Sequence, residues 1–210
     1  MTFFVKDFFV ISGILLLLFG GCGFSKPDIP MEKGSVTPGT AVHRGDNTFT
    51  LIGEPVSLGQ PLPSVPLVDA QSMKDVDLSQ EKGKILFLSI VPSIDTKVCE
   101  AQTHYLGEEG DELAPLIERI TISRDTLFAQ KRFAEQAKLT DVRYLSDYKT
   151  GEFGKSSGLL MEGLALLARS VIVVDKQGKI RYIQVVPEIT HLPDMETAFE
   201  KALKLAKEDS

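Results

Sequence analysis

Apolar and polar residues divide the chain into a short apolar leader, a polar segment and a long region patterned like a folded domain. The core of the leader, residues 8–19, reads FFVISGILLLLF and contains no charged residue. Its 12 residues fall short of the roughly 20 that a stable transmembrane helix needs. Lys6 precedes this run, and two glycines and Cys22 follow it, in the order of a secretory leader. We therefore expect residues 1–21 to form a signal peptide.

Residues 22–47 are rich in Gly, Pro, Ser and charged residues, and they show neither strand nor helix periodicity. Segments of this composition connect folded units without forming a core of their own. We expect a flexible tether over residues 22–47 and one folded domain over residues 48–210. A domain of that length is of ordinary size, and the chain has no room for a second catalytic domain.

Strand patterns dominate the first half of the predicted domain. Residues 48–58 alternate around a Gly-Glu-Pro sequence, as the strands of an N-terminal β-hairpin do. Residues 84–91, KILFLSIV, are almost continuously apolar and β-branched, which predicts a central strand that is covered on both faces. Residues 117–123 repeat this signal. Apolar positions after Asp125 then recur at helical spacing, so a helix is expected to follow that strand.

The second half of the predicted domain ends in a hairpin and a helix. Residues 170–175 and 179–186 are apolar stretches on either side of a turn, which predicts a second hairpin. Beyond them, Asp194 can cap a helix with one apolar stripe. The stripe consists of Met195, Phe199, Leu203 and Ala206. Strands that alternate with helices in this order predict an α/β fold of the thioredoxin-like type, with a central mixed sheet flanked by helices.

Composition and charge narrow the possible functions. Apolar residues make up 43% and charged residues 25% of the chain, which is the balance of a globular protein with a real core. The formal net charge is −6 and no Lys/Arg cluster stands out, so we do not expect a nucleic-acid partner. The three histidines are scattered without metal-ligand spacing, and we expect no metal and no other cofactor.

The two cysteines, Cys22 and Cys99, lie in very different surroundings, which argues against a disulfide framework or a cysteine-based zinc site. Cys99 ends the string PSIDTKVC, directly after the predicted central strand. Ligand sites in α/β sheets gather at that end of the strands. A thiol in the first turn of the following helix faces free backbone N–H groups and the positive end of the helix dipole, which favour the thiolate. Cys99 is therefore a candidate nucleophile, although a lone cysteine without this context is more often a small buried hydrophobe.

The string around Cys99 resembles the peroxiredoxin signature, in which a proline is followed four residues later by a threonine and three residues after that by the peroxidatic cysteine. Pro92, Thr96 and Cys99 match it position by position. Three further stretches resemble one branch of that family, the bacterial thiol peroxidases. These stretches are SRDTLFAQKRF at residues 123–133, LLARSVIVVD at 166–175 and VPEIT at 186–190. The resemblance extends over nearly the whole predicted domain.

The resemblance implies a thioredoxin-like fold and a thiol-based peroxidase mechanism. Cys99 would attack a peroxide oxygen and become a sulfenic acid. Arg169 would stabilise the thiolate and bind a peroxide oxygen; its alternative role, a surface ion pair, fits poorly within the run LLARSVIVV. Thr96 would hydrogen-bond the peroxide, and Pro92 would shield the thiolate from water. The alternative roles of these two residues are those of a helix cap and a turn former.

The chain departs from the family pattern at Ala134. Thiol peroxidases typically carry a second, resolving cysteine directly after the FAQKRF motif, and Ala134 occupies that position here. We therefore expect the sulfenic acid to be reduced by an external thiol or thioredoxin-like reductant, or through a disulfide between the Cys99 residues of two chains. The resemblance further implies a homodimer.

The segment after Cys99 departs as well, because it contains Gly107 and Gly110. Inside a helix each glycine costs about 1 kcal/mol relative to alanine. We expect the helix to be short or loose there.

The leader has a resemblance of its own. The stretch LLFGGC is similar to a bacterial lipoprotein signal, in which a lipid is attached to the cysteine and the leader is cut just before it. Cys22 would then be the lipidated mature N-terminus and would hold the domain at a membrane of the bacterial cell envelope, facing the periplasm or the exterior. The alternatives are an uncleaved anchor and an ordinary signal peptide.

Two rival functions are compatible with part of the sequence. A thiol-disulfide oxidoreductase would share the fold, but its chemistry normally needs a CxxC pair, and the sequence contains none. A peroxide sensor or envelope-binding lipoprotein without turnover would explain Ala134. A purely structural role would not require all four residues of the peroxidase motif together, so a peroxidase is the function that the sequence favours.

Overall fold

The computed structural model describes residues 29–113, 115–139 and 141–208. The predicted signal peptide and Cys22 lie outside these residues. Within the described part of the chain, no helix combines the length and the hydropathy that a membrane span requires.

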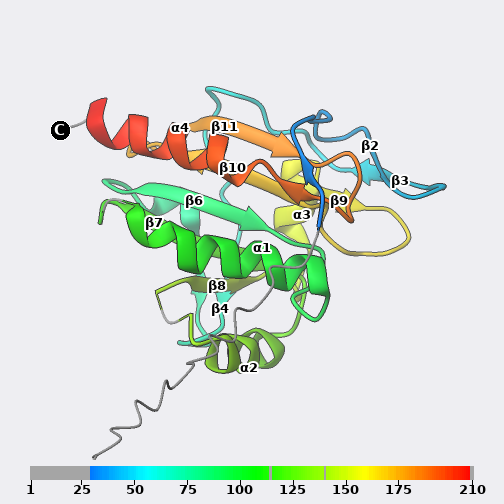
Figure 1. The fold of residues 1–210 in the computed structure, drawn as a ribbon, viewed down its shortest axis with the longest axis horizontal. Coiled ribbons are helices and arrows are strands. Elements are labelled where there is room, and N and C mark those ends of the chain that lie inside the picture. The colour runs from blue at the N-terminus through cyan, green and yellow to red at the C-terminus, as the bar shows by residue number, and fades with distance from the viewer. Residues whose placement is uncertain (1–28, 114, 140, 209–210) are drawn as a thin grey trace, which may run out of the picture.

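A mixed sheet of seven strands forms the centre of the described domain (Figure 1). In spatial order the strands are β11 (Ile180–Val185), β10 (Ser170–Val174), β6 (Ile85–Ile90), β7 (Ile117–Ser123), β8 (Arg143–Ser146), β4 (Leu67–Asp69) and β5 (Asp75–Val76). Strands β6, β7 and β8 run parallel, and antiparallel pairs complete the sheet on both sides. The predicted central strand is confirmed, because all six residues of β6 are buried.

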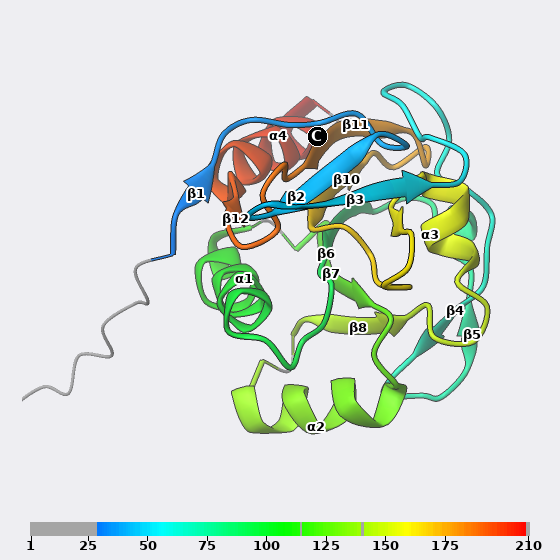
Figure 2. The same ribbon diagram turned by 90° about the vertical axis from the view of Figure 1, so that its right-hand side faces the viewer.

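The two faces of this sheet are covered differently (Figure 2). The helices α1 (Lys97–Glu108), α2 (Leu127–Ala137) and α4 (Met195–Glu208) pack on one face. The other face carries α3 (Glu152–Ser157) and a small sheet of β2 (Ala41–Arg44), β3 (Asn47–Ile52) and β9 (Leu160–Met161). A 3₁₀ helix, η1, spans Leu78–Gln80. This arrangement confirms the predicted α/β fold with a central mixed sheet flanked by helices.

The C-terminal elements follow the sequence pattern closely. Strands β10 and β11 form the predicted second hairpin. Helix α4 begins directly after Asp194, whose Oδ1 accepts a hydrogen bond from the Thr197 backbone N–H at 3.0 Å, as a capping residue does. On the apolar face of α4, the Phe199 ring lies 5.0 Å from the ring of Phe87 in β6.

The N-terminal hairpin is present but lies earlier in the chain than predicted. It is formed by β2 and β3, with Ala41 paired with Thr50. The Gly-Glu-Pro sequence that we expected at its turn follows the second strand instead. Gly53 has a φ of +113°, and its backbone passes so close to the Lys155 carbonyl group that a side chain would clash. This glycine therefore allows the close approach of β3 to α3, and it does not form the hairpin turn.

The predicted boundary between tether and domain at residue 48 is wrong. Strand β1 (Met31–Glu32) pairs in parallel with β12 (Leu192–Pro193), and Val42 is fully buried in the main core. A segment with few apolar residues can be ordered by backbone hydrogen bonds to a distant part of the chain, and such pairing leaves no local periodicity. Residues 22–28 of the predicted tether lie outside the described residues.

Gly107 does not loosen the helix after Cys99, whereas the α-helix ends before Gly110. Helix α1 continues through Gly107 to Glu108 and then tightens into the 3₁₀ helix η2 (Glu109–Glu112). Gly107 packs against Leu139, and a Cβ at this position would come within 2.5 Å of the Leu139 side chain. The glycine permits close packing between α1 and the segment after α2, which outweighs its low helix propensity.

Candidate active site

Cys99 lies where the sequence predicts, in the first turn of α1. Strand β6 ends, the chain crosses the loop 91–96, and Cys99 is the third residue of the helix that follows. The thiol belongs to a small apolar cluster and is completely buried. This Cys99 cluster consists of Val91, Ile94 and Cys99, with Phe133 of α2 packed against it.

The sheet brings Arg169 to the thiol from 70 residues further along the chain. Arg169 directly precedes β10, which pairs with β6 so that Ser170 lies opposite Ile90. Its Nη2 donates a hydrogen bond to Cys99 Sγ at 3.2 Å, and the residue is only 2% exposed. The alternative role of a surface ion pair is wrong, since Arg169 is buried and pairs with no carboxylate among the described residues.

Two further acceptors hold the Arg169 guanidinium in place. Nε donates to the Ile189 carbonyl oxygen at 2.8 Å, and Nη1 donates to Gln102 Oε1 at 2.6 Å. The Gln102 amide nitrogen donates in turn to Ser89 Oγ at 2.8 Å. Burial lowers the pKa of Arg169 below its ordinary value, and the neighbouring Cys99 partly offsets this effect. The guanidinium thus faces the thiol, and no carboxylate among the residues that the structure describes neutralises its charge.

Sequence reasoning missed Gln102 and Ile189. Gln102 could have been found, because a residue three positions after Cys99 lies on the same helix face. Ile189 contributes its backbone carbonyl group, so the identity of its side chain carries no signal.

Thr96 and Pro92 lie in the loop that leads into α1. Thr96 is the N-cap residue of α1, but its hydroxyl caps no helical N–H group and donates instead to the Ser93 carbonyl oxygen at 3.2 Å. The alternative role of a side-chain helix cap is therefore absent. Pro92 is buried at the start of the loop. The contacts of both residues with a peroxide stay predictions.

Comparison with known proteins decides the family. Residues 57–201 match the family model described as Redoxin. The thiol peroxidases of Halalkalibacterium halodurans and Staphylococcus saprophyticus are 41% and 43% identical to this chain over 156 and 152 residues. These matches cover 74% and 72% of this chain and 93% and 91% of the two relatives. The chain belongs to the bacterial thiol peroxidases.

Solved structures agree on the fold of this thiol peroxidase. A peroxiredoxin-like protein from Aquifex aeolicus matches with a TM-score of 0.73 at 31% identity, covering 79% of this chain and 96% of that protein. A thiol peroxidase from Chromobacterium violaceum matches with a TM-score of 0.69 at 22% identity, covering 81% of this chain and 99% of that protein, and this likeness supports the fold alone. The predicted thioredoxin-like fold is confirmed, and the protein is an enzyme of the peroxiredoxin type.

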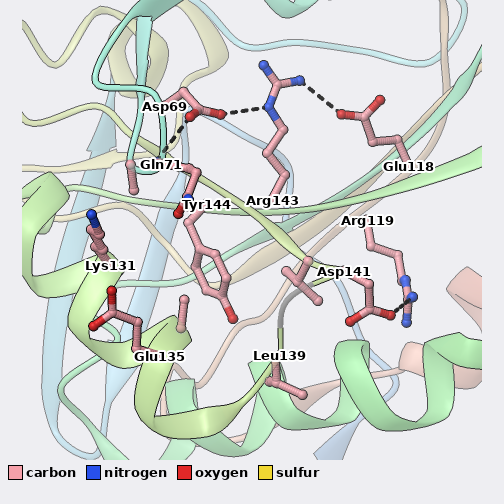
Figure 3. Close-up of a pocket in the computed structure, with 13 residues that line it drawn as sticks. Asp69, Gln71, Glu118, Arg119, Lys131, Glu135, Leu139, Asp141, Arg143 and Tyr144 are labelled. Atoms are coloured by element: carbon pink, nitrogen blue, oxygen red, sulfur yellow. Dashed lines mark hydrogen bonds and ion pairs between the residues drawn. The ribbon is translucent and has the colours of Figure 1, made fainter.

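Ala134 of this thiol peroxidase lines a cavity of about 450 Å³. The cavity lies between α2, the segment that follows it and β8, with Lys131 and Glu135 on the α2 side and Tyr144 on the β8 side (Figure 3). Cys99 is not among the residues that line it. A cysteine in place of Ala134 would therefore have room for its side chain, but it would lie at this cavity and outside the Cys99 cluster.

Cys99 is the only free cysteine in the part of the chain that the structure describes. In the same residues, no group of three or more His, Cys, Asp or Glu side chains could hold a metal ion. The described domain thus offers one thiol for redox chemistry.

Proposed function

We propose that this thiol peroxidase reduces hydrogen peroxide and organic hydroperoxides at Cys99. The observation that supports this most directly is the 3.2 Å hydrogen bond from Arg169 Nη2 to Cys99 Sγ at a fully buried position. A cation at this distance stabilises the thiolate, which is the nucleophilic form of cysteine. The first turn of α1 adds the positive end of its dipole.

In the first half-reaction, the Cys99 thiolate attacks one peroxide oxygen and the O–O bond breaks. The sulfur is oxidised to a sulfenic acid, and the peroxide is reduced to an alcohol or water once the leaving oxygen has taken up a proton. Negative charge moves from the sulfur to the leaving oxygen, and Arg169 stabilises it along this path. The Thr96 hydroxyl hydrogen-bonds the peroxide, and Pro92 keeps water away from the thiolate.

In the second half-reaction, an external thiol or a thioredoxin-like reductant reduces the sulfenic acid. The external thiolate attacks the sulfenic sulfur, hydroxide leaves as water after protonation, and a second thiol opens the mixed disulfide. Ala134 at the resolving position and the absence of another cysteine among the described residues support this route. A disulfide between two chains would need two completely buried Cys99 sulfurs to become accessible and come within about 2 Å of each other, whereas a mixed disulfide with an external thiol needs only one.

Treatment of reduced protein with one equivalent of hydrogen peroxide tests both half-reactions. We expect Cys99 to be trapped as a dimedone adduct, and excess peroxide to drive it to sulfinic acid. Turnover should return when 2-mercaptoethanol or thioredoxin is added. Cys99→Ser should abolish peroxide consumption. Ala134→Cys, which places a thiol at the cavity wall, should leave the first half-reaction intact. Mass spectrometry of this variant after peroxide treatment shows whether an internal disulfide forms.

Other outcomes of this experiment point to other functions. A wild-type protein that stays fully reduced would favour the non-catalytic alternative, a peroxide sensor or an envelope-binding lipoprotein. Rapid and quantitative dimerisation through Cys99 would replace the external thiol by an intermolecular disulfide.

We further propose that the chain is a lipoprotein of the bacterial cell envelope, anchored through a lipid on Cys22 with its domain facing the periplasm or the exterior. The sequence LLFGGC supports this. The intact mass of the protein from the membrane fraction should correspond to an acylated chain that begins at Cys22, and Cys22→Ser should release the protein from that fraction. An unmodified Cys22 or a retained Met1 would contradict the proposal.

We also propose a homodimer that packs surfaces near the two active sites against each other. Phe128 at the start of α2 is 68% exposed, and the same helix packs Phe133 against the Cys99 cluster. Exposed aromatic side chains are enriched at the centres of interfaces. Sedimentation of the protein at micromolar concentration should show a dimer that Phe128→Asp weakens; a wild-type monomer under these conditions would count against it.

A further inference from the structure

The cavity at Ala134 contains a buried polar group without a partner. Tyr144 lines this cavity and is only 6% exposed. Its hydroxyl makes no hydrogen bond to any residue that the structure describes, although buried polar side chains are nearly always hydrogen-bonded. Burial, together with the nearby Asp141, holds the pKa of Tyr144 above its ordinary value, so the hydroxyl stays protonated. The cavity therefore offers a hydrogen-bond donor to a ligand.

Most of the charged residues that line the cavity neutralise one another. Arg143 donates to the carboxylates of Asp69 and Glu118 at 2.9 Å, and Arg119 pairs with Asp141. Such pairing is expected around a cavity, because an isolated charge is costly to remove from water. These residues therefore leave little charge for a ligand.

Lys131 and Glu135 are the other charged residues of the lining. Both lie on the α2 side of the cavity (Figure 3), and neither makes an ion pair with another residue that the structure describes. Residues four apart on a helix are neighbours, with about 5–6 Å between their Cβ atoms, but a lysine that precedes a glutamate is the less favourable order for a direct pair. One cation and one carboxylate are thus available side by side at the cavity.

An amino acid complements this pair of side chains. Its ammonium and carboxylate groups sit on one carbon, so Glu135 can bind the first while Lys131 binds the second. Ala134, between them in the sequence, takes up little of the cavity, and Leu139 and Val142 add apolar wall for the side chain of a ligand. The volume of about 450 Å³ falls within the range of small-molecule sites, roughly 300–1,000 Å³.

Phe133 connects the cavity to the Cys99 cluster. Its ring lies 6.1 Å from the ring of Tyr144, measured between centroids, and it packs against the Cys99 cluster. Helix α2 thus presents Phe133 to the cluster and the next residue, Ala134, to the cavity. A molecule held in the cavity lies close to the cluster, and holding two reactants close together raises their effective concentration.

We propose that the cavity binds a small zwitterionic thiol of the cysteine type, which reduces oxidised Cys99. This rests on the proposed function, in which an external thiol reduces the sulfenic acid, and it names the chemical class of that thiol. Glu135 binds the ammonium group, Lys131 binds the carboxylate, and the Tyr144 hydroxyl donates a hydrogen bond to the ligand inside the cavity.

The redox step balances with two molecules of this thiol. The first thiolate attacks the Cys99 sulfenic sulfur, the S–O bond breaks, hydroxide leaves as water after protonation, and a mixed disulfide forms. A second thiolate attacks the ligand sulfur of that mixed disulfide. Cys99 is thereby restored as a free thiol, and the two ligand molecules leave as their disulfide.

A series of thiols tests the two charges of the ligand separately. These are L-cysteine, cysteamine without the carboxylate, N-acetylcysteine without the ammonium, and 2-mercaptoethanol without either. Each is mixed with the preformed sulfenic acid of the full chain, and rate constants are compared per thiolate, the reactive form. In the wild type we expect the reaction with cysteine to saturate and to be about tenfold or more faster than the reaction with 2-mercaptoethanol.

Charge variants should then discriminate among these thiols. Lys131→Gln should slow the reaction with cysteine by about threefold to tenfold and leave that with cysteamine unchanged. Glu135→Gln should slow the reaction with cysteine to a similar degree and leave that with N-acetylcysteine unchanged. Lys201→Gln is the matched control: it changes an exposed lysine of α4 that does not line the cavity, and all rate constants should stay within about twofold of wild type.

Equilibrium binding gives a readout that does not depend on redox chemistry. S-methyl-L-cysteine, which forms no disulfide, should bind the reduced wild type in calorimetric titration. Ala134→Leu fills the cavity and should abolish binding, whereas Ala134→Ser should retain it. Tyr144→Phe should weaken binding without lowering the unfolding free energy, because the hydroxyl has no partner among the described residues. A purely structural role of this hydroxyl would lower the stability and leave binding unchanged.

Several outcomes would overturn the proposal. Equal rate constants for all thiols together with no binding of S-methyl-L-cysteine would leave the cavity to water. A preference for cysteine that survives both charge variants would place its binding elsewhere, and efficient reduction by thioredoxin without such a preference would assign the reaction to a protein reductant. If peroxide does not oxidise the wild-type chain, the proposed function fails and S-methyl-L-cysteine binding alone decides the site. If Ala134→Leu does not fold, Tyr144→Phe decides it.

Discussion

Arg143 and Arg169 both make several hydrogen bonds inside the protein, but their partners differ in charge. Arg143 of β8 donates to the carboxylates of Asp69, Glu81 and Glu118 at 2.8–2.9 Å. Figure 3 shows the bonds to Asp69 and Glu118. Burial by itself would lower the pKa of Arg143, but these three bonds outweigh it and hold the pKa above its ordinary value. The charge of Arg143 is therefore fully compensated within the protein.

Arg169 is buried more deeply and has uncharged partners. Its guanidinium donates to the Ile189 carbonyl group and the Gln102 side-chain amide as well as to the Cys99 thiol. Its pKa is lowered by burial. An arginine that several carboxylates surround supports the fold, whereas one that is held by neutral acceptors keeps its charge for an anion. In the proposed function that anion is the Cys99 thiolate or a peroxide oxygen.

Replacement of Arg169 should have the largest effect, and it should fall on activity. In Arg169→Met we expect the rate constant for Cys99 oxidation to fall by about 10²–10³-fold, because the variant loses the donor that stabilises charge on the sulfur and the leaving oxygen. The unfolding free energy should change by less than about 2 kcal/mol, since removal of a buried charge offsets the loss of three hydrogen bonds. Rapid-quench oxidation and urea denaturation measure the two quantities, and a wild-type oxidation rate would refute the assignment of Arg169.

Replacement of Arg143 should show the converse. Arg143→Met leaves three carboxylates close together with only Lys84, which pairs with Glu118, as a remaining cation. We expect the unfolding free energy to fall by about 2–3 kcal/mol. Oxidation of Cys99 in the folded variant should proceed at the wild-type rate, because Arg143 lies outside the Cys99 cluster. Urea denaturation and rapid-quench oxidation of the same preparation measure stability and activity. An Arg143→Met variant with a slower Cys99 oxidation and an unchanged unfolding free energy would contradict the comparison.

Gln102 sharpens the comparison between the two arginines. It is a neutral group that orients Arg169, whereas carboxylates orient Arg143. Gln102→Leu removes the acceptor for Nη1, and the guanidinium should lose part of its orientation toward the sulfur. We expect Cys99 oxidation to slow by about tenfold, the effect of one lost hydrogen bond of about 1.4 kcal/mol. Gln102→Asn is the matched control for polarity, and a full wild-type rate in Gln102→Leu would show that Arg169 needs no such support.

The smallest expected effect concerns acid. Burial opposes the ionisation of Asp69 and Glu118, but hydrogen bonds from Ser72 and Arg143 to the first and from Lys84 and Arg143 to the second hold their pKa values below the ordinary 3.8 and 4.5. A depressed carboxyl pKa contributes stability that is complete above the ordinary value and is lost as the pH falls through the folded-state value. The unfolding free energy should therefore decline below about pH 4.5, and less steeply in Arg143→Met. Equal slopes in wild type and variant would mean that other carboxylates govern acid unfolding.

The local pattern of apolar residues was sufficient to predict an element wherever that element packs its own side chains into the core. The apolar run of β6, the hairpin of β10 and β11, and the stripe of α4 all appear in the sequence as periodic or continuous burial, and the structure confirms them. The N-terminal segment was misjudged because it is ordered by pairing with residues far along the chain, as β1 is with β12. Such pairing uses backbone groups that every residue carries, so it leaves no mark on the side-chain pattern.

The same division holds at the active site. The sequence by itself determined the family and predicted the nucleophile Cys99 and its arginine, because both rest on residue types at fixed spacing. Only the tertiary structure decided that Arg169 lies 3.2 Å from the sulfur, that Gln102 and the Ile189 carbonyl group hold it, and that Ala134 lies at a cavity apart from the thiol. The physical reason is that distance, burial and hydrogen-bond partners arise when strands from distant parts of the chain pair in one sheet, and no single segment contains that information.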